Sequence, residues 1–546
     1  MIVKSYRSFL RKYAVFISLV IAVCLSLFLS IYNIQSNPPG FNSDEAAFGY
    51  NAYSILQTGK DEYGSFMPFR FKSFGEYKMP LYGYLSVPFI ASMGLSELST
   101  RILNIVLSTL FPILIFFLTK ELFQRKSIAV ISALLTSTSL GLTIVARHAH
   151  EAFLGVFLLT IASYFFIKFL KSEKVSTAVY FSVSLLLGLF AYQAVRIYAV
   201  AALLFAVFYF FKKRKFTKPK TILIGLLILV IGFFAYTDVM NKPNRVQNLL
   251  LFTNQGFALK VTELRAEGGS IFFYNKATIG LLDVLKKQMT YYSPQFLAGD
   301  GDTNDRFGYK DMYPMTPLVY SFVFVGLYFI FKNKEKFRYF LLTLLLISPL
   351  SASLAWTDIS LTRSLFLFIP LLITSAYGID AILMHKKIKN NILLSSFVLL
   401  FMQTLFLFYS WNFYLNHYPY RSTVIRSWQA GYAELGEYLK DKYSTKDTFY
   451  ITRKNGQPYI YTLFYLKYPP ADYQKSATLS ELDEYGFGQV EKYDKFIFSL
   501  PQNAINEKNA VLIGYPDDFN QFPTIPKESI KVIKVGSEEI FWIYET

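Results

Sequence analysis

The sequence predicts an all-α polytopic membrane protein of about eleven transmembrane helices plus interfacial helices, followed by a small C-terminal α/β domain. Of the 546 residues, 53% are hydrophobic and 17% are charged, whereas soluble proteins carry about 25% charged residues. The apolar residues form long runs, such as residues 14–32 and 392–409. These runs have the length of roughly 20 residues that a helix needs to cross a bilayer, where the backbone must satisfy its own hydrogen bonds.

The net charge of +18 would suggest a nucleic-acid partner in a soluble protein, but its placement favours another explanation. Lysines and arginines gather in short segments between apolar runs, which is the pattern of cytoplasmic loops in membrane proteins. The charge therefore indicates a lipid bilayer rather than nucleic acid as the partner. The basic segments are residues 4–12, 120–126, 168–174, 212–220, 332–338 and 386–389.

The first apolar run follows basic residues, as a secretory signal would, but no small-residue cleavage site follows it. We therefore expect an uncleaved first span with the N-terminus in the cytoplasm. Cys24, the only cysteine, lies inside this run, so no intrachain disulfide is expected.

Placing every basic segment in the cytoplasm gives a consistent topology for a multi-pass protein of the cell membrane, with the C-terminal residues outside the cytoplasm. Residues 81–94 are apolar but short, so we expect an interfacial or re-entrant helix there, and a further span is the alternative. The expected spans cover residues 14–32, 99–119, 127–146, 152–170, 176–193, 197–211, 220–237, 316–331, 339–355, 363–384 and 391–410.

The composition of the chain changes after Ser410. Residues 1–410 are expected to form the transmembrane domain with a first outside loop at 33–80, and residues 411–546 the α/β domain. The C-terminal segments expected to be ordered are strands at 459–467, 495–500 and 530–535 and an amphipathic helix at 426–442.

A pair of acidic residues, Asp44 and Glu45, follows the first span closely. A turn-forming Pro-Pro-Gly sequence precedes the pair, and a helix is expected over residues 46–56. Ser43 or Asp44 would suit the N-cap of that helix. Because charges at a membrane rim are costly unless they are used, a functional role for the two carboxylates is the competing interpretation.

Three cations lie on the same expected side as these acids. Lys78 closes the first outside loop beside Pro80 and Tyr82, where a cation suits the phosphate of a lipid. Arg196 and Arg363 stand at the outer ends of two expected spans, where together they would suit a phosphate. The simpler alternative for each is a side chain that extends to the membrane surface without binding a ligand.

Arg147, His148, His150 and Glu151 lie between two expected spans and include two of the four histidines. If this segment were helical, Arg147 and His148 would both lie about one turn before Glu151. One face would then present a cation, an imidazole and a carboxylate to a substrate. The spacing matches no standard zinc motif, and an ordinary salt bridge at the membrane surface is the alternative.

Three short motifs, at residues 39–45, 78–82 and 97–101, together resemble the family 39 glycosyltransferases. This family has the GT-C architecture and includes the protein O-mannosyltransferases and the aminoarabinose transferases of lipid A. The resemblance implies transfer of a sugar from a polyprenyl-phosphate donor to an acceptor on the non-cytoplasmic face. One departure is Met79, at a position where relatives frequently have proline.

The resemblance also implies roles for individual residues. Asp44 matches the catalytic acidic residue of the first loop, Glu45 its neighbour, and Glu151 the second acidic position. The other candidates are Lys78, Arg196 and Arg363 for the donor phosphate and Tyr82, Arg147, His148 and His150 for substrate contacts.

General chemistry agrees with these roles. Transfer from a phosphate-linked sugar needs a base near the acceptor hydroxyl and positive charge on the departing phosphate. Asp44 would be the base and Lys78 would bind the phosphate. Asp44 and Glu151 would also suit a divalent cation such as magnesium or manganese, so the sequence leaves the use of a metal open.

Two other functions are alternatives to an enzyme. A transporter or flippase of a lipid-linked saccharide would carry charges in mid-span, whereas here the charges gather at one rim, which favours chemistry there. A catalytically silent relative that binds a polyprenyl lipid is the second alternative. The sequence identifies neither the sugar, the oligomeric state nor the acceptor, whether protein, lipid or glycan.

Overall fold

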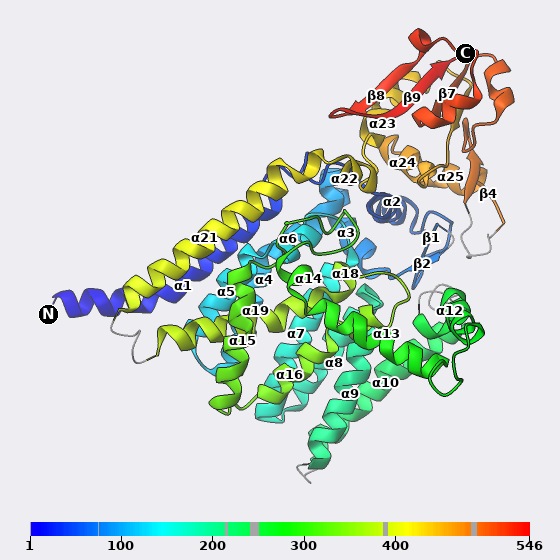
Figure 1. Ribbon diagram of the computed structural model, residues 1–546. Helices are drawn as coiled ribbons and strands as arrows, with labels where there is room; N and C mark the ends of the chain where they lie inside the picture. Colours follow the sequence, from blue (N-terminus) through cyan, green and yellow to red (C-terminus); the bar gives the residue numbers. More distant parts are fainter. Residues whose placement is uncertain (1, 75, 213–216, 241–249, 386–390, 482–488) are drawn as a thin grey trace. The chain divides into compact units, whose positions relative to one another are not determined.

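The computed structural model describes residues 2–74, 76–212, 217–240, 250–385, 391–481 and 489–546 (Figure 1). The basic segment expected at 386–389 lies outside these residues, as does part of the one at 212–220. The chain forms two compact units, which we call the helical unit and the sheet unit. The helical unit comprises Met1–Tyr32, Asn104–Arg147 and Glu151–Tyr414, and the sheet unit comprises Asn33–Leu103, His148–His150 and Leu415–Thr546.

The helical unit carries the membrane-spanning segments. Within the described residues, seven helices are long and apolar enough to cross a membrane, or eight when the bent pair α5 (Lys126–Thr138) and α6 (Leu140–Ala146) counts as one span. This number of candidate spans among the described residues is lower than the expected number of about eleven, and the structure describes further, shorter apolar helices. The seven are α1 (Ile2–Ile31), α4 (Glu97–Phe123), α7 (Glu151–Ser172), α9 (Val195–Lys212), α10 (Lys218–Met240), the Leu361–Leu383 segment that contains α18 (Leu361–Ser364), η2 (Leu365–Leu367) and α19 (Phe368–Leu383), and α21 (Ile392–Asn416).

Three further expected spans coincide with shorter apolar helices. α8 (Val175–Ala191) has 17 residues and α15 (Pro317–Lys332) has 16, which at 1.5 Å per residue is about 25 Å or less. The hydrocarbon core of a bilayer is about 30 Å thick. The third is divided into α16 (Arg338–Ile347) and α17 (Leu350–Ser353). These helices are apolar like the longer candidates and differ from them in length.

Close backbone contact joins helices inside this unit. A Cβ atom on Gly326 of α15 would lie 2.0 Å from the carbonyl oxygen of Thr374 on α19, so only glycine permits this approach. At the start of α5, Arg125 donates to Glu335 at 2.7 Å and to Asp380 at 3.3 Å. The shorter elements of the unit are η1 (Leu251–Thr253), α12 (Gln255–Ala266), α13 (Lys276–Tyr291) and α14 (Pro294–Ala298).

Among its described residues, the sheet unit contains a mixed sheet of seven strands in the order β4-β5-β6-β3-β7-β9-β8. β3 pairs in parallel with β6 and β7, with Phe449 opposite Phe496 and Val511, and the remaining pairs are antiparallel. The sheet confirms the expected mixed fold of the C-terminal residues. The strands are β3 (Thr448–Ile451), β4 (Thr478–Leu479), β5 (Val490–Tyr493), β6 (Phe496–Ile497), β7 (Ala510–Gly514), β8 (Lys531–Val535) and β9 (Glu538–Glu545).

The helices of this C-terminal part differ from expectation in two places. The strand expected at 459–467 is wrong, because α24 (Pro458–Tyr465) is a helix that begins with proline at a first-turn position. The single helix expected at 426–442 is divided, because Gly431 has a φ of +95°. The helical elements here are η3 (Tyr418–Tyr420), α22 (Ser422–Ser427), α23 (Tyr432–Lys442), α24, α25 (Pro470–Ser476), η4 (Gln502–Asn506), η5 (Pro516–Gln521) and η6 (Lys527–Ser529).

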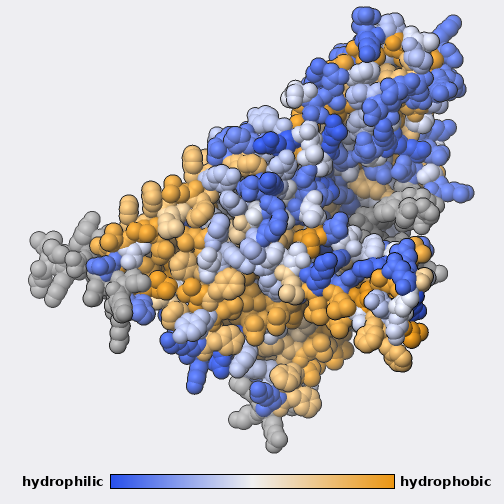
Figure 2. Space-filling model, viewed as in Figure 1, coloured by the Kyte–Doolittle hydropathy of each residue, from blue (hydrophilic) through white to orange (hydrophobic). Residues whose placement is uncertain are grey.

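The first outside loop belongs to the sheet unit, an association that the sequence did not predict. It forms α2 (Ser43–Thr58), a hairpin of β1 (Phe71–Ser73) and β2 (Glu76–Lys78), and the short helix α3 (Leu81–Met93). α2 packs against α24, and a Cβ atom on Gly49 would lie 2.6 Å from the Phe464 ring. Figure 2 shows hydrophobic residues over much of the helical unit and mainly hydrophilic ones over the sheet unit.

Candidate active site

The N-terminus of α2 is capped by Asn42, and not by Ser43 or Asp44 as the sequence suggested. The Asn42 Oδ1 atom accepts from the backbone N–H groups of Asp44 at 2.9 Å and Glu45 at 3.2 Å. Glu45 Oε2 accepts in return from the Asn42 N–H at 3.3 Å, which completes a capping box. The Asp44 carboxylate is therefore not needed to cap the helix.

Asp44 pairs with Lys78. The Lys78 Nζ atom donates to Asp44 Oδ1 at 2.5 Å, and the side chains are 8% and 43% exposed respectively. The ammonium group also lies 4.7 Å from the ring centroid of Phe74 and 5.3 Å from that of Phe48, distances typical of cation–π contacts. The hairpin thus holds a buried lysine beneath a carboxylate that solvent or a substrate can reach.

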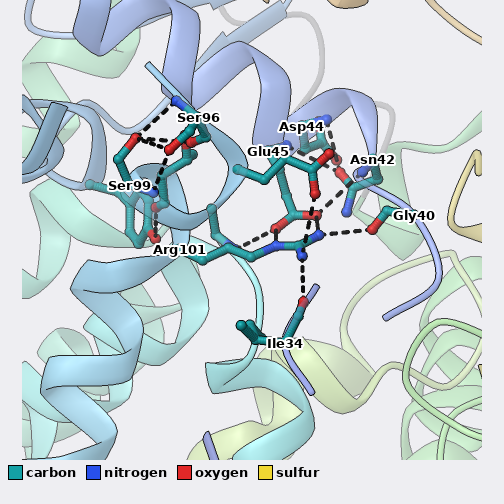
Figure 3. A network of polar contacts seen from close by, with 12 residues as sticks. Ile34, Gly40, Asn42, Asp44, Glu45, Ser96, Ser99 and Arg101 are labelled. Atoms are coloured by element: carbon teal, nitrogen blue, oxygen red, sulfur yellow. Dashed lines mark hydrogen bonds and ion pairs between the residues drawn. The ribbon is translucent and has the colours of Figure 1, made fainter. Parts of the chain in front are cut away.

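Glu45 pairs with Arg101 in the interior of the sheet unit (Figure 3). Arg101 donates from Nε to Glu45 Oε1 at 2.9 Å and from Nη2 to Oε2 at 3.0 Å, and both side chains are buried. Arg101 also donates to the carbonyl oxygens of Ile34 and Gly40, while Glu45 Oε1 accepts from the Ala149 N–H at 2.8 Å. This bidentate pair joins three chain segments, which favours a positioning role for Glu45.

The segment between α6 and α7 is not helical, so the expected helical face formed by Arg147, His148 and Glu151 does not exist. Arg147 is buried, and its Nη1 and Nη2 atoms donate to the carbonyl oxygens of Leu29 at 2.7 Å and Tyr32 at 2.8 Å. These contacts secure the end of α1.

The expected substrate contacts Tyr82 and His148 are buried as well. The Tyr82 hydroxyl donates to the Thr100 carbonyl oxygen at 2.9 Å. The His148 ring packs edge-on against Trp428 at 5.3 Å, and the ring of the partly buried His150 lies 5.4 Å from that of His148. In this structure Tyr82 and His148 contribute to packing within the sheet unit.

The remaining candidates belong to the helical unit. Glu151 is the first residue of α7, Arg196 lies in the first turn of α9, and Arg363 lies in α18, where its Nη1 atom contacts Thr357 Oγ1. Partly buried Tyr192 interacts electrostatically with both Arg363 and Glu151. The structure therefore brings one acid and one arginine of the predicted set into the same neighbourhood.

Sequence reasoning missed Glu62, a fully buried acid near Lys78. Burial, and to a smaller extent the neighbouring Asp61, raise the pKa of Glu62 to about 8 against an opposing effect of Lys78. An adjacent Asp-Glu pair at 61–62 repeats the pair at 44–45. This repetition is the sequence feature that could have identified Glu62. Arg101 was also missed as a site residue, although it lies in the third motif.

In the described part of the chain, no group of three or more His, Cys, Asp and Glu side chains gathers closely enough to hold a metal ion. Binding of magnesium or manganese by Asp44 and Glu151 remains a prediction.

Comparison with known proteins confirms the resemblance to membrane glycosyltransferases. The family described as dolichyl-phosphate-mannose-protein mannosyltransferase matches residues 78–236, a range that includes Lys78 but not Asp44. No curated protein sequence matches the chain.

Solved structures agree with the fold. ArnT from Cupriavidus metallidurans bound to undecaprenyl phosphate superposes with a TM-score of 0.57 at 10% identity, covering 97% of this chain and 98% of ArnT. The apo form of ArnT gives 0.55 at 11% identity, covering 96% and 97%. Oligosaccharyltransferase AglB from Archaeoglobus fulgidus, in complex with an inhibitory peptide and a dolichol-phosphate, gives 0.49 at 14% identity. The match covers 84% of this chain, which spans 64% of the length of AglB.

Proposed function

We propose that this protein is a membrane glycosyltransferase that transfers a sugar from a polyprenyl-phosphate donor to an acceptor, with Asp44 as the general base. The observation that carries the proposal is the pair of half-exposed Asp44 and buried Lys78, joined at 2.5 Å, on the loop that follows the first span. The ArnT-like fold and the family match support the reaction class.

Asp44 suits removal of the acceptor proton, and Lys78 suits stabilisation of the departing phosphate. The acceptor hydroxyl gives its proton to Asp44 while its oxygen bonds to the anomeric carbon of the sugar. The bond from that carbon to the phosphate oxygen breaks, and its electron pair stays on the departing phosphate. Lys78 stabilises that charge. Because the Lys78 ammonium group and the Asp44 carboxylate lie side by side, one pair can serve both the donor phosphate and the acceptor hydroxyl.

Glu45 and Arg101 hold the loop in place under this proposal. Their bidentate pair joins α2, the start of α4 and residue 149, and it leaves each Glu45 oxygen with two donors. The Glu45 side chain is also buried, so the hydroxyl group of an acceptor does not reach it. We therefore assign Glu45 a positioning role in place of the catalytic role expected from sequence.

The other site residues keep roles that rest on sequence alone. Glu151 is proposed to orient the acceptor, and Arg196 and Arg363 to bind phosphate. Arg147, His148, His150 and Tyr82 make structural contacts in this structure, and we propose no chemical step for them.

We further propose that the N-terminus is cytoplasmic and that the C-terminal residues lie outside, since the roughly eleven spans expected from the sequence would place every basic loop inside in this orientation. A reporter that fluoresces only in the cytoplasm, fused after Thr546, should stay dark. A bright fusion would reverse the orientation and move the site to the cytoplasmic face.

The activity is tested by incubating membranes that contain the protein with a panel of radiolabelled polyprenyl-phosphate sugars. Protein, lipid and polysaccharide fractions are then assayed for label against membranes carrying Asp44→Asn. We expect one donor to label one fraction, and to do so only with the unaltered protein. Equal label with Asp44→Asn would remove Asp44 as the base, and label moved across the bilayer without a new bond would favour a transporter.

A further inference from the structure

Glu62 is held inside the sheet unit by the turn between α2 and β1. The neighbouring Asp61 Oδ1 atom accepts from the N–H groups of Tyr63 at 3.0 Å and Ser65 at 2.8 Å, which closes the turn. The Glu62 N–H donates to Asn51 Oδ1 at 3.0 Å. These bonds fix the backbone so that the Glu62 side chain is 0% exposed.

The two oxygens of this buried carboxyl are poorly supplied with donors. Oε1 accepts from the Tyr459 hydroxyl at 3.4 Å, and that hydroxyl also lies 3.2 Å from the Tyr63 hydroxyl. Within the described residues, Oε2 has no hydrogen-bond partner. A carboxylate anion in this setting would carry a large desolvation cost, so the surroundings favour the neutral acid.

The same carboxyl interacts electrostatically with the lysine of the candidate site. The Lys78 Nζ atom lies over the Phe74 ring. Tyr459 of α24 packs edge-on against Phe74 at 6.0 Å. The C-terminal part of the chain therefore supplies the hydroxyl that contacts Glu62, from a tyrosine that packs on the same Phe74 ring as Lys78.

The net charge around Lys78 depends on whether Glu62 is neutral or ionised. With Glu62 neutral, Asp44 is the carboxylate bonded to Lys78, and one cation balances one anion. With Glu62 ionised, two anions would flank one cation, and a donor phosphate would meet net negative charge. The titratable groups that face Glu62 from its surroundings are Asp61, Lys78, Tyr50, Tyr63, Tyr459 and Tyr473.

We propose that Glu62 is a positioning residue for Lys78: as a neutral acid it leaves the lysine available to Asp44 and the donor phosphate, and its ionisation draws the lysine inward and weakens donor binding. This inference rests on the proposed function. The pKa of about 8 for Glu62, raised mainly by burial, places the change just above neutral pH.

The test measures binding of undecaprenyl phosphate to the full-length protein in nanodiscs from pH 7.5 to pH 9.5. The second ionisation of the phosphate, at about 6, is complete over this range. We expect affinity to fall about tenfold as one nearby charge appears at an effective dielectric constant near ~20. In Glu62→Gln, which cannot ionise, affinity should be high and constant across the range.

Asp61→Asn is the matched control, because asparagine keeps an oxygen that accepts from the same turn N–H groups. It removes a charge that raises the pKa of Glu62, so the fall in affinity should move to lower pH and persist. This variant also tests the inference if Glu62→Gln does not fold. An unmoved midpoint would then contradict it.

The Lys78→Ala and Glu62→Gln variants distinguish failure of the proposed phosphate role of Lys78 from failure of the inference about Glu62. If Lys78→Ala binds undecaprenyl phosphate as well as the unaltered protein, the proposed phosphate role fails. If Lys78→Ala binds more weakly but Glu62→Gln shows the same pH dependence as the unaltered protein, only the inference about Glu62 fails. An affinity that is independent of pH in the unaltered protein would also overturn it.

Discussion

The two carboxylates that open α2 are neighbours in the sequence but occupy opposite surroundings. Glu45 is 0% exposed and accepts four hydrogen bonds from Arg101 and two backbone N–H groups. Asp44 is 43% exposed and is held by Lys78. Successive residues on a helix point in different directions. The Glu45 carboxylate therefore stabilises the loop, whereas the Asp44 carboxylate is accessible to a substrate.

The two cations differ in the same way. Arg101 offers a planar fork that binds a carboxylate through two parallel hydrogen bonds, whereas Lys78 offers a single charge on a flexible chain. A lysine is therefore the better residue to exchange one anion for another during a reaction. The comparison separates residues that hold the site from residues that act in it.

Breaking the buried pair should have the largest effect on stability. Arg101→Ala leaves Glu45 charged and buried without its main partner, which costs about 3–5 kcal/mol in comparable pairs. We expect a large fall in the thermal unfolding temperature in detergent, together with loss of activity. An unchanged unfolding temperature would mean that the pair does not secure the loop.

The stability contribution of Glu62 should depend on pH. Its pKa rises from the ordinary glutamate value of 4.5 to about 8 in the folded protein, so the folded state keeps a proton that the unfolded state releases. Stability contributed by the neutral acid is therefore full below the unfolded pKa and is lost as pH rises, by roughly 3 kcal/mol between about pH 5 and 7.5.

Comparison of thermal unfolding across this pH range in the unaltered protein and in Glu62→Gln isolates the effect from other titrating groups. The difference between the two proteins should grow with pH in favour of glutamine. Parallel curves would show that Glu62 is already ionised in the folded state.

Removing Lys78 should weaken donor binding while leaving the fold intact. Lys78→Ala should raise the apparent KM for the lipid donor by the value of one charge-assisted contact, about 1.5–3 kcal/mol. Lys72→Ala, on the other strand of the hairpin, is the matched control and should leave KM unchanged. Equal donor affinity in Lys78→Ala and the unaltered protein would reduce Lys78 to a structural partner of Asp44.

We expect the smallest effect on stability from substitutions of Asn42, the N-cap residue of α2. Asn42→Ala removes the acceptor of the capping box and should cost about 1 kcal/mol, whereas Asn42→Asp should cost little because aspartate caps equally well. Unfolding temperatures of the two variants, measured together, test this directly. A greater loss in Asn42→Asp would show that Asp44 and Glu45 do not tolerate a third nearby charge.

The sequence predicted what depends on local pattern. The apolar runs, the short helix at α3 and the helix that follows Asp44 could be found because helix length and polarity are local properties. The strand expected at 459–467 was wrong because a short aromatic run suits a buried strand or a buried helix equally, and Pro458 at the start of α24 favours the helix.

Features that depend on burial could not be predicted. The exposure of Asp44 and the enclosure of Glu45 follow from contacts with residues far along the chain, such as Arg101 and Ala149. Glu62 looks like any loop acid until Tyr459, almost four hundred residues later, is placed beside it. The association of the first loop with the C-terminal sheet was hidden for the same reason.

The central claim is tested most directly by the turnover of Asp44→Asn, measured with saturating donor and corrected for the amount of folded protein. Asparagine keeps the size of aspartate, and Asn42 caps the helix in either case, so folding and donor binding should survive. The account predicts that kcat falls by about 10²–10⁴-fold, as expected for a lost general base. Turnover close to that of the unaltered protein would contradict it, because Asp44 would then be only the partner that keeps Lys78 in place.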